Sequence, residues 1–344
     1  MLSHRAQVGR LRWLAVRALA SYPLVDPRLS FVAHGENTTF RVEASTPGLR
    51  TQANRRDRFL LRVHRPNRHG RGVDSAAAIT SELDWLTALR ADTGLSVPEP
   101  LLTCDGSPTA TVSCAPIPEP RVCSVLRWMD GRVHSGSPKP IHMRRLGGAM
   151  ARMHNHAQTW ERPASFVRMR WDWETFFGDT MEYGGVNAAE VWNLLPDDLR
   201  RRFDRVACTM QGIMTSLGDG PDMVGLIHAD LHLDNALFAH DDIRLIDFDD
   251  SGVGYWLYDI AVALWELRHR PDYESFRTAL IQGYTRYRTL PTEDLVHLDD
   301  FIATREVAFG LWFVGTAQVN PAFRDDLDDQ LAAITRSLDA LERA

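Results

Sequence analysis

The feature that most constrains this chain of 344 residues is a pair of short polar motifs, each placed after a short apolar stretch. The first motif, HADLHLDN, places Asn235 five residues after Asp230. The second motif, LIDFDD, contains Asp247 and Phe248. A polar turn between buried strands, with aspartates as helix caps, would explain one such residue. Five positions within twenty residues match an order of residues known from enzymes, which indicates a catalytic or ligand-binding site instead.

The residue types in these motifs fit phosphoryl transfer. That reaction needs a carboxylate beside the acceptor hydroxyl, to orient it and to take its proton, and Asp230 offers one. It also needs oxygen ligands for Mg²⁺, which prefers carboxylate or amide oxygens together with phosphate oxygens and water. Asn235 and Asp247 offer such oxygens, and the same order of residues occurs in protein kinases. The motifs therefore predict a site that uses ATP and Mg²⁺.

The pattern of apolar residues predicts an α+β fold with two lobes. Short strands with one long helix (about residues 74–91) fill the first part, after a short amphipathic helix over 11–19. The strands are expected at 29–33, 38–43, 58–63, 101–104, 109–113 and 121–129. Beyond Asp130-Gly131, helices are expected at 141–157, 199–217, 255–268, 274–287, 294–315 and 327–341, with strands at 224–227 and 243–246. We therefore expect a sheet lobe over 1–126, a hinge over 127–131 and a helical lobe over 132–344.

At these motifs the chain resembles the aminoglycoside phosphotransferase and choline kinase family, a branch of the protein-kinase-like fold. The pattern of that family is H-G-D-x-x-x-x-N followed by I-D-F or I-D-W. Here the residues are His228-Ala229-Asp230 to Asn235, then Ile246-Asp247-Phe248. Stretches 126–131, 146–154 and 254–265 agree as well, so the likeness covers roughly residues 25–320. Stretches 36–42 and 166–173 are similar to a sub-branch that contains homoserine kinases and bacterial stress-response kinases.

The resemblance implies a kinase that transfers the γ-phosphate of ATP to a hydroxyl group of a small molecule. It also implies a role for individual residues. Asp230 would be the catalytic base, with Asn235, Asp247 and Asp249 around Mg²⁺. The N-terminal lobe would bind the nucleotide, with its adenine on the backbone of Leu126, Trp128 and Met129. Asp259 would accept hydrogen bonds from the catalytic loop, whereas His228 and His232 would be structural.

The turn expected at the nucleotide phosphates departs from the glycine-rich loop of kinases. It has a single glycine, Gly35, in the sequence HGENTT. Such a turn, with Asn37 and Thr38, can still direct backbone N–H groups and hydroxyls at phosphates. We therefore place these three residues at the nucleotide.

The lysine that kinases carry on their third strand is absent. The only lysine of the chain, Lys139, lies beyond the hinge, and Arg62 stands at the expected strand position. Its planar guanidinium suits a phosphate, although an outward-pointing strand arginine is the alternative. Its partner should be Glu82, which lies at the edge of the apolar stripe of its helix, whereas Asp84 points away.

Charge narrows the possible partners. The net charge is −6, with 17 basic and 12 acidic residues over 1–130 and 22 basic and 33 acidic residues over 131–344. The acidic second part suits metal ions or a cationic acceptor such as an aminoglycoside. Eight arginines between residues 50 and 71 lack interleaved aromatic residues, so we expect no nucleic-acid partner. The longest apolar run, 260–265, is far too short for a membrane span, so we expect a cytoplasmic protein without a membrane partner.

The sequence leaves several alternative functions open. A protein kinase of the bacterial stress-response type would use the same catalytic residues. A nucleotide-binding pseudokinase would explain the altered loop and the missing lysine, but such a binding module needs no catalytic base. The sequence leaves open the identity of the acceptor, the choice of ATP or GTP, and the oligomeric state.

Overall fold

The chain forms two compact units in a computed structural model that describes residues 4–35, 37–46, 56–66, 74–115, 117 and 119–342. The first unit comprises Met1–Gly131 and Arg162–Val167, and the second comprises Arg132–Glu161 and Arg168–Ala344. Within the described residues, no helix is long and apolar enough to cross a membrane.

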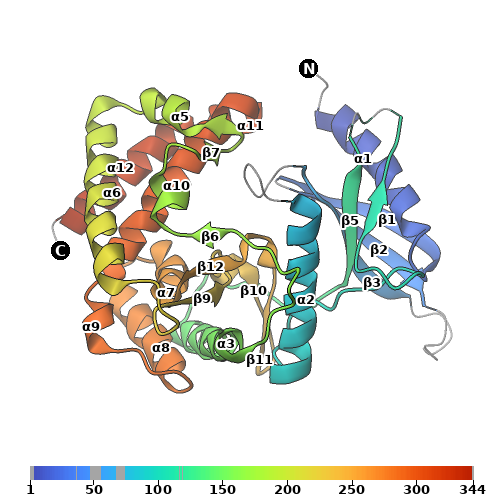
Figure 1. Cartoon of the computed structure of the whole chain (residues 1–344), viewed down its shortest axis with the longest axis horizontal. Helices are drawn as coiled ribbons and strands as arrows, with labels where there is room; N and C mark the ends of the chain where they lie inside the picture. Colours follow the sequence, from blue (N-terminus) through green and yellow to red (C-terminus); the bar gives the residue numbers. More distant parts are fainter. Residues whose placement is uncertain are drawn as a thin grey trace. The chain divides into compact units, whose positions relative to one another are not determined.

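The first unit is built on an antiparallel sheet of five strands, with the order β1-β2-β3-β5-β4 (Figure 1). Its strands are β1 (Val25–His34), β2 (Thr38–Ser45), β3 (Asp57–Val63), β4 (Ala110–Val112) and β5 (Arg121–Arg127). The register pairs Phe40 with Leu61 and Leu61 with Val125, so apolar residues of three strands lie on one face. Helix α1 (His4–Leu19) covers that face.

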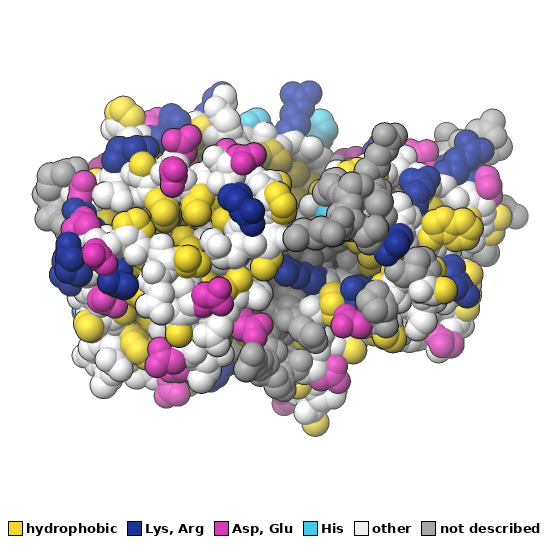
Figure 2. All heavy atoms as spheres, turned by 90° about the horizontal axis from the view of Figure 1, so that it is seen from above, with side chains coloured by type: hydrophobic (Ala, Val, Ile, Leu, Met, Phe, Trp, Pro, Cys, Tyr) yellow, Lys and Arg dark blue, Asp and Glu magenta, His cyan; other side chains and the backbone are white. Residues whose placement is uncertain are grey.

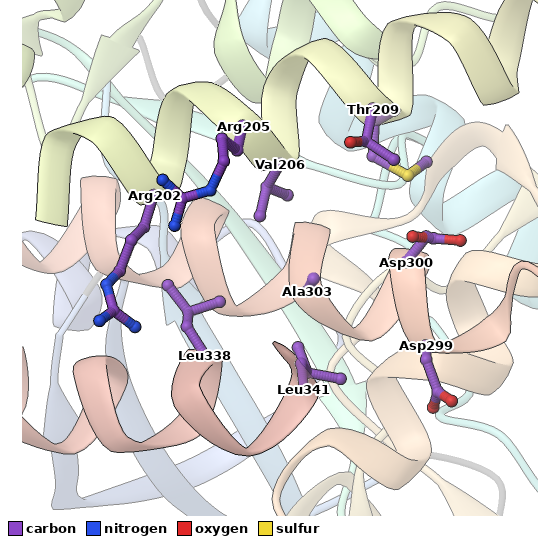
Figure 3. Close-up of a pocket in the computed structure, with 10 residues that line it drawn as sticks. Arg202, Arg205, Val206, Thr209, Asp299, Asp300, Ala303, Leu338 and Leu341 are labelled. Atoms are coloured by element: carbon purple, nitrogen blue, oxygen red, sulfur yellow. The ribbon is translucent and has the colours of Figure 1, made fainter. Parts of the chain in front are cut away.

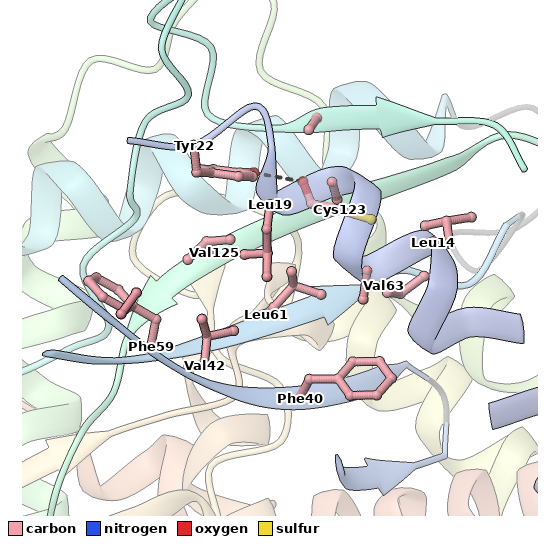
Figure 4. Packing of buried hydrophobic residues seen from close by; sticks show 14 residues of the cluster. Leu14, Leu19, Tyr22, Phe40, Val42, Phe59, Leu61, Val63, Cys123 and Val125 are labelled. Carbon is pink, nitrogen blue, oxygen red and sulfur yellow. Dashed lines mark hydrogen bonds between the residues drawn. The ribbon is translucent and has the colours of Figure 1, made fainter. Parts of the chain in front are cut away.

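Figure 4 shows this core between α1 and the sheet. Leu14 and Leu19 from the helix pack with alternate residues of the strands, such as Phe40, Leu61 and Val125. The alternation follows from the pleat of a strand, which sends successive side chains to opposite faces. The hydroxyl of Tyr22 donates a hydrogen bond to the carbonyl of Cys123 at 3.0 Å, so the polar end of this buried ring is also satisfied.

Helix α2 (Ser75–Thr93) is delimited by its caps. The side chain of Asp74 accepts from the N–H of Ala76 at 2.9 Å, which satisfies a donor that the first turn leaves unpaired. Gly94 ends the helix in the left-handed conformation, with φ at 64°, which a residue without Cβ adopts at little cost. The buried residues of α2 include Glu82, a charged group among apolar neighbours.

The second unit is mainly helical (Figure 1). Its helices are α3 (Pro140–Thr159), α4 (Trp173–Phe177), α5 (Ala188–Leu194), α6 (Asp197–Leu217), α7 (Trp256–Trp265), α8 (Tyr273–Thr285), α9 (Thr292–Leu295), α10 (Leu298–Val319), α11 (Pro321–Arg324) and α12 (Leu327–Glu342). Glycines let α3 and α8 pack very closely. A Cβ on Gly147 would lie 2.1 Å from the carbonyl oxygen of Leu280, and one on Gly283 would lie 2.0 Å from that of Arg144.

Short strands and 3₁₀ turns in the second unit carry the polar motifs. β9 (Val224–Ile227) and β6 (Arg170–Trp171) flank β12 (Gly252–Tyr255), and β10 (Ala236–Ala239) pairs with β11 (Asp242–Leu245). A further two-stranded ribbon joins β7 (Glu182–Tyr183) to β8 (Val186–Asn187). The turns η1 (Leu233–Asn235) and η2 (Phe248–Asp250) contain polar residues of the two motifs.

The antiparallel sheet and the mostly helical second part confirm the expected α+β class, but some elements differ. The strand expected over 101–104 is absent: Leu101 donates one hydrogen bond to Val125, but Thr103 donates to Ser107 and Cys104 to Ser21, so no ladder continues. The expected helix over 255–268 begins only at Trp256, because β12 ends at Tyr255. The expected helix over 294–315 is divided into α9 and a longer α10.

The surface in Figure 2 shows basic and acidic side chains interspersed with apolar and neutral ones. Of the eight arginines between residues 50 and 71, four lie outside the described residues: Arg50, Arg55, Arg68 and Arg71. Three of the others have acidic partners: Arg56 pairs with Asp26 at 2.9 Å, Arg58 pairs with Asp130 at 2.5 Å, and Arg62 pairs with Glu82.

Candidate active site

The loop after β9 holds the predicted catalytic carboxylate. β9 ends at Ile227, and Ala229 adopts a left-handed conformation with φ at 67°. This conformation is uncommon for a residue with a Cβ. It turns the chain sharply between the strand and Asp230, whose side chain is 21% exposed.

The carboxylate of Asp259, on α7, anchors this loop. It accepts the backbone N–H of His228 at 2.9 Å and that of Ala229 at 2.6 Å, which confirms the predicted contact with the catalytic loop. His154 of α3 donates to the same carboxylate at 3.0 Å, and its other ring nitrogen lies 2.9 Å from the hydroxyl of Tyr284. Both Asp259 and His154 are fully buried.

Backbone hydrogen bonds bring the second motif beside the first. The N–H of Ile246 donates to the carbonyl of Asn235 at 3.0 Å, and the ring of His228 lies 3.0 Å from the carbonyl of Ile246. Asp247 follows directly and has a left-handed backbone, with φ at 65°. The structure therefore places Asn235 and the start of the Asp247 turn together, although they are twelve positions apart in the sequence.

The oxygen atoms at this place suit a hard divalent cation. The amide nitrogen of Asn235 donates to the carboxylate of Asp230 at 3.0 Å, which leaves its amide oxygen as an acceptor. Asp247 is exposed, whereas Asp249 is 3% exposed. One amide oxygen and two carboxylates are the donor set that Mg²⁺ accepts beside phosphates and water. The residues present therefore fit the predicted metal.

Two side chains that sequence reasoning missed hold the turn that carries these carboxylates. The guanidinium of Arg168 donates to the carbonyls of Ser251 and Asp249, at 2.5 and 2.6 Å. The indole N–H of Trp171 donates to the carbonyl of Asp250 at 2.8 Å. The one signal for these residues in the sequence was that stretch 166–173 is similar to a sub-branch of the resembled family.

Arg305 on α10 is a further residue that the sequence did not indicate. Its guanidinium donates to one carboxylate oxygen of Asp230, and the ring of His232 lies 3.5 Å from the other oxygen. Burial alone would raise the pKa of Asp230, but the charge of Arg305, followed by His232, holds that pKa below its usual range. The carboxylate is therefore ionised at neutral pH.

His232 lies among three carboxylates. A ring nitrogen is 3.5 Å from Glu266 and 4.0 Å from Asp234, and such groups can hold a metal. Burial alone would lower the pKa of His232, but the adjacent carboxylates of Asp230 and Glu266 raise it to about 10. A protonated imidazole has no free lone pair for a metal, so at neutral pH this group is a charge cluster around an imidazolium.

In the first unit, Arg62 and Glu82 form the predicted ion pair. Arg62 is 4% and Glu82 0% exposed. Arg62 lies on β3 next to Leu61 and Val63, whose side chains face the core under α1, and it points to the other face. The pairing is confirmed, and the alternative of an outward-pointing strand arginine is wrong.

The turn between β1 and β2 uses its side chains internally. The hydroxyl of Thr38 lies 2.7 Å from a ring nitrogen of His34, and Asn37 accepts the N–H of Arg65 at 3.2 Å. Gly35 is exposed, and its N–H donates to the carbonyl of Asn37 at 3.0 Å.

The stretch expected at adenine follows β5. Leu126 is buried within that strand, whereas Trp128 and Met129 are partly exposed beyond its end. The N–H of Trp128 donates to the carbonyl of Arg58 at 2.9 Å. An adenine ring would therefore have to use other backbone groups of this stretch.

A cavity of about 280 Å³ in the second unit contains none of the predicted site residues. It lies between α6, α10 and α12 (Figure 3). Arg202 and Arg205 lie toward one end and Asp299 and Asp300 toward the other, with apolar residues such as Ala303 and Leu341 between them.

Comparison with known proteins decides the family. Residues 28–295 match the sequence profile of the phosphotransferase enzyme family. The chain belongs to this family. It is a phosphotransferase with the protein-kinase-like fold, and it acts on an alcohol group, as the resemblance implied.

Several members of the phosphotransferase family are similar to this chain, some over most of its length and others over part of it. An amicoumacin kinase of Bacillus subtilis is 26% identical over 307 residues, which cover 84% of this chain and 81% of that protein. A homoserine kinase of Rhodopseudomonas palustris is 29% identical over 205 residues, 58% of this chain and 57% of that protein. The solved structure of a microcompartment-associated aminopropanol kinase has a TM-score of 0.79 and 28% identity, covering 96% of this chain and 97% of that one.

Proposed function

We propose that this phosphotransferase moves the γ-phosphate of ATP, in a reaction that depends on Mg²⁺, to the hydroxyl of a small acceptor that carries an amino group. The observation that carries the proposal is the carboxylate of Asp230, which accepts a hydrogen bond from the amide nitrogen of Asn235, with the Asp247 turn directly adjacent. Little covalent chemistry is required of a kinase, so catalysis depends on such positioning and on charge.

Asp230 would orient the acceptor hydroxyl and accept its proton as the new O–P bond forms. Its loop is held by Asp259, so the carboxylate needs little rearrangement when the acceptor binds. Asn235, Asp247 and Asp249 would hold Mg²⁺, which when bound neutralises charge on the nucleotide phosphates. Arg168 and Trp171 keep the backbone of the Asp249 turn in place.

The nucleotide would bind to residues of the first unit. Arg62, held by Glu82, would contact a phosphate with its planar guanidinium. Because the side chains of Asn37 and Thr38 and the N–H of Gly35 already have partners, the turn at Gly35 would contribute mainly its other backbone N–H groups. The backbone from Leu126 through Trp128 to Met129 would contact adenine.

The relatives support an acceptor with an amino group. Two kinases similar over most of this chain are named for aminopropanol and amicoumacin, and a third, similar over part of it, for homoserine. The acidic composition of residues 131–344 is compatible with a cationic acceptor. We therefore infer an amino alcohol or an aminoglycoside-like compound.

The test measures ADP release with Mg²⁺ and ATP, or GTP, over a panel of aminopropanol, homoserine, choline, aminoglycosides and a generic protein acceptor. We expect a small acceptor to stimulate release, and Asp230→Ala to reduce that rate by at least about 100-fold. The matched control is Asp241→Asn, which removes a carboxylate that is fully exposed in the same unit.

Each other outcome contradicts part of the proposal. An undiminished rate in Asp230→Ala would remove Asp230 from the reaction. Phosphate transferred to protein alone would indicate a protein kinase instead. Nucleotide binding without release for any acceptor would favour the pseudokinase.

A further inference from the structure

The carboxylate of Asp230 is contacted from a helix far along the chain. One of its oxygens accepts from Arg305 of α10, 75 positions away. The other accepts from Asn235 at 3.0 Å and lies 3.5 Å from the ring of His232. Each oxygen therefore has a donor of its own, and together the donors oppose rotation of the carboxylate about its Cβ–Cγ bond.

Arg305 is itself held in place by neighbours. Its guanidinium lies over the ring of Trp265, 5.0 Å from the centroid, an arrangement that favours a cation. The indole N–H of Trp265 donates to Glu306 at 2.7 Å, and Glu306 also accepts from Ser337 on α12. Three helices, α7, α10 and α12, thus fix where the guanidinium lies.

Stability alone is a poor explanation for this arrangement. The side chain of Arg305 is only 14% exposed, so its charge has lost most of its water. Desolvation of a buried ion pair offsets much of the attraction between the charges. What the contact does provide is a defined geometry for one carboxylate, which is what in-line phosphoryl transfer requires of the group that orients the acceptor.

We propose that Arg305 is a positioning residue for phosphoryl transfer, an inference that rests on the proposed function. Arg305 holds the Asp230 carboxylate in the orientation that receives the acceptor hydroxyl. A carboxylate has about four lone-pair sites, so an oxygen that accepts from Arg305 can still accept from a hydroxyl. Without the guanidinium the carboxylate would turn, and the hydroxyl would be misaligned. The chemical step would slow while nucleotide binding stayed intact.

The experiment compares the full-length wild type with Arg305→Gln, Arg305→Lys and Arg305→Ala, using the acceptor found in the panel above. We expect kcat to fall about 100-fold in Arg305→Gln, the usual order for a misplaced reacting group, with KM for ATP changed by less than about threefold. Arg305→Lys should recover part of kcat. Added guanidinium ion at millimolar concentration should partly restore Arg305→Ala.

The matched control is Arg201→Gln, which removes an arginine of α6 that is 64% exposed and pairs with Asp198 at 3.4 Å. It should leave kcat and KM unchanged. Thermal melting and binding of a non-hydrolysable ATP analogue, measured on every variant, show whether each one folds.

The outcomes separate this inference from the function on which it rests. A wild type without acceptor-dependent ADP release contradicts the proposed function. An active wild type together with Arg305→Gln at a kcat within twofold of it contradicts the positioning role alone. A loss of kcat, analogue binding and melting temperature together, with no recovery by lysine or guanidinium, would also overturn it, because that pattern belongs to a purely structural residue.

Discussion

The carboxylate of Asp259 accepts the backbone N–H of Ala229 at 2.6 Å, and so joins helix α7 to the loop that presents Asp230. Its other oxygen accepts from both the backbone N–H of His228 and the ring of His154, at 2.9 and 3.0 Å. The stability of the fold is sensitive to this buried carboxylate and its three donors. Any donor that loses its acceptor remains desolvated without a hydrogen bond, at its full free-energy cost.

Asp259→Asn should therefore be strongly destabilising despite its similar shape. Either orientation of the amide directs an NH₂ group at a backbone N–H, so one hydrogen bond becomes a contact between two donors. We expect the free energy of unfolding to fall by about 3 kcal/mol, measured by urea denaturation. Asp241→Asn, at an exposed site, should change it by less than about 0.5 kcal/mol. Equal stability of the two variants would contradict the anchoring role.

Ala229→Gly tests the left-handed turn before Asp230. Alanine at a φ of 67° is strained by about 1 kcal/mol, whereas glycine adopts this conformation freely. The pattern of the resembled family has glycine here. We expect a gain in the free energy of unfolding of up to about 1 kcal/mol, with unchanged nucleotide binding. A clear loss of stability would show that the methyl group of Ala229, which is fully buried, matters more than the backbone strain.

Two helical glycines should respond oppositely to alanine. Gly147→Ala would place a Cβ 2.1 Å from the backbone oxygen of Leu280, so α3 and α8 would have to separate. Gly212→Ala, on the exposed side of α6, meets nothing within 4 Å. We expect Gly147→Ala to lower the melting temperature by several degrees, and Gly212→Ala to raise stability by about 1 kcal/mol through helix propensity. Similar effects from both variants would contradict the close packing of the two helices.

The buried pair of Arg62 and Glu82 can be measured with a double-mutant cycle. Removing one partner leaves the other charge buried alone, so Arg62→Met or Glu82→Gln should each cost about 3 kcal/mol of stability. The double variant should cost less than the sum of the two, because no charge is then left alone. Additive losses would mean that the two groups do not interact.

His154 should make stability fall at mildly acidic pH. Burial lowers the pKa of His154 below the value of about 6.5 that it has in the unfolded chain. Above pH 6.5 the group is neutral in both states and has no effect. Below pH 6.5 the unfolded chain binds a proton that the folded one does not, so stability falls by up to about 1.4 kcal/mol per pH unit until the folded pKa is reached. Urea denaturation between pH 5 and 8 should show this slope, and His154→Gln should flatten it.

Residues close together in the sequence were the easier part to predict. Asp230, Asn235 and Asp247 lie within eighteen residues, and their spacing matches the pattern of the resembled family. Arg62 and Glu82 could be paired because a strand alternates its side chains and a helix has a defined face. Arg305 was missed because it lies 75 residues from Asp230 and is one of 38 arginines, none of which stands out by spacing.

The errors in the fold have physical causes as well. A run of apolar residues predicted a strand over 101–104, but the N–H groups of Thr103 and Cys104 donate to Ser107 and Ser21, neither of which lies in a strand. β6 has two residues and β12 has four, too few for alternation to be recognised. Such strands form because their neighbours supply the hydrogen bonds, and only the folded chain brings those neighbours together.

The anchoring of the loop that presents Asp230 has a consequence for its motions. The amide hydrogens of His228 and Ala229 are bonded to a carboxylate on α7, which a histidine of α3 contacts as well. Neither amide can reach solvent by a small movement of the loop alone, because its acceptor lies in the core. Exchange of these two hydrogens with deuterium should therefore occur only when the helical unit unfolds as a whole, at the slowest rate of any backbone position in that unit.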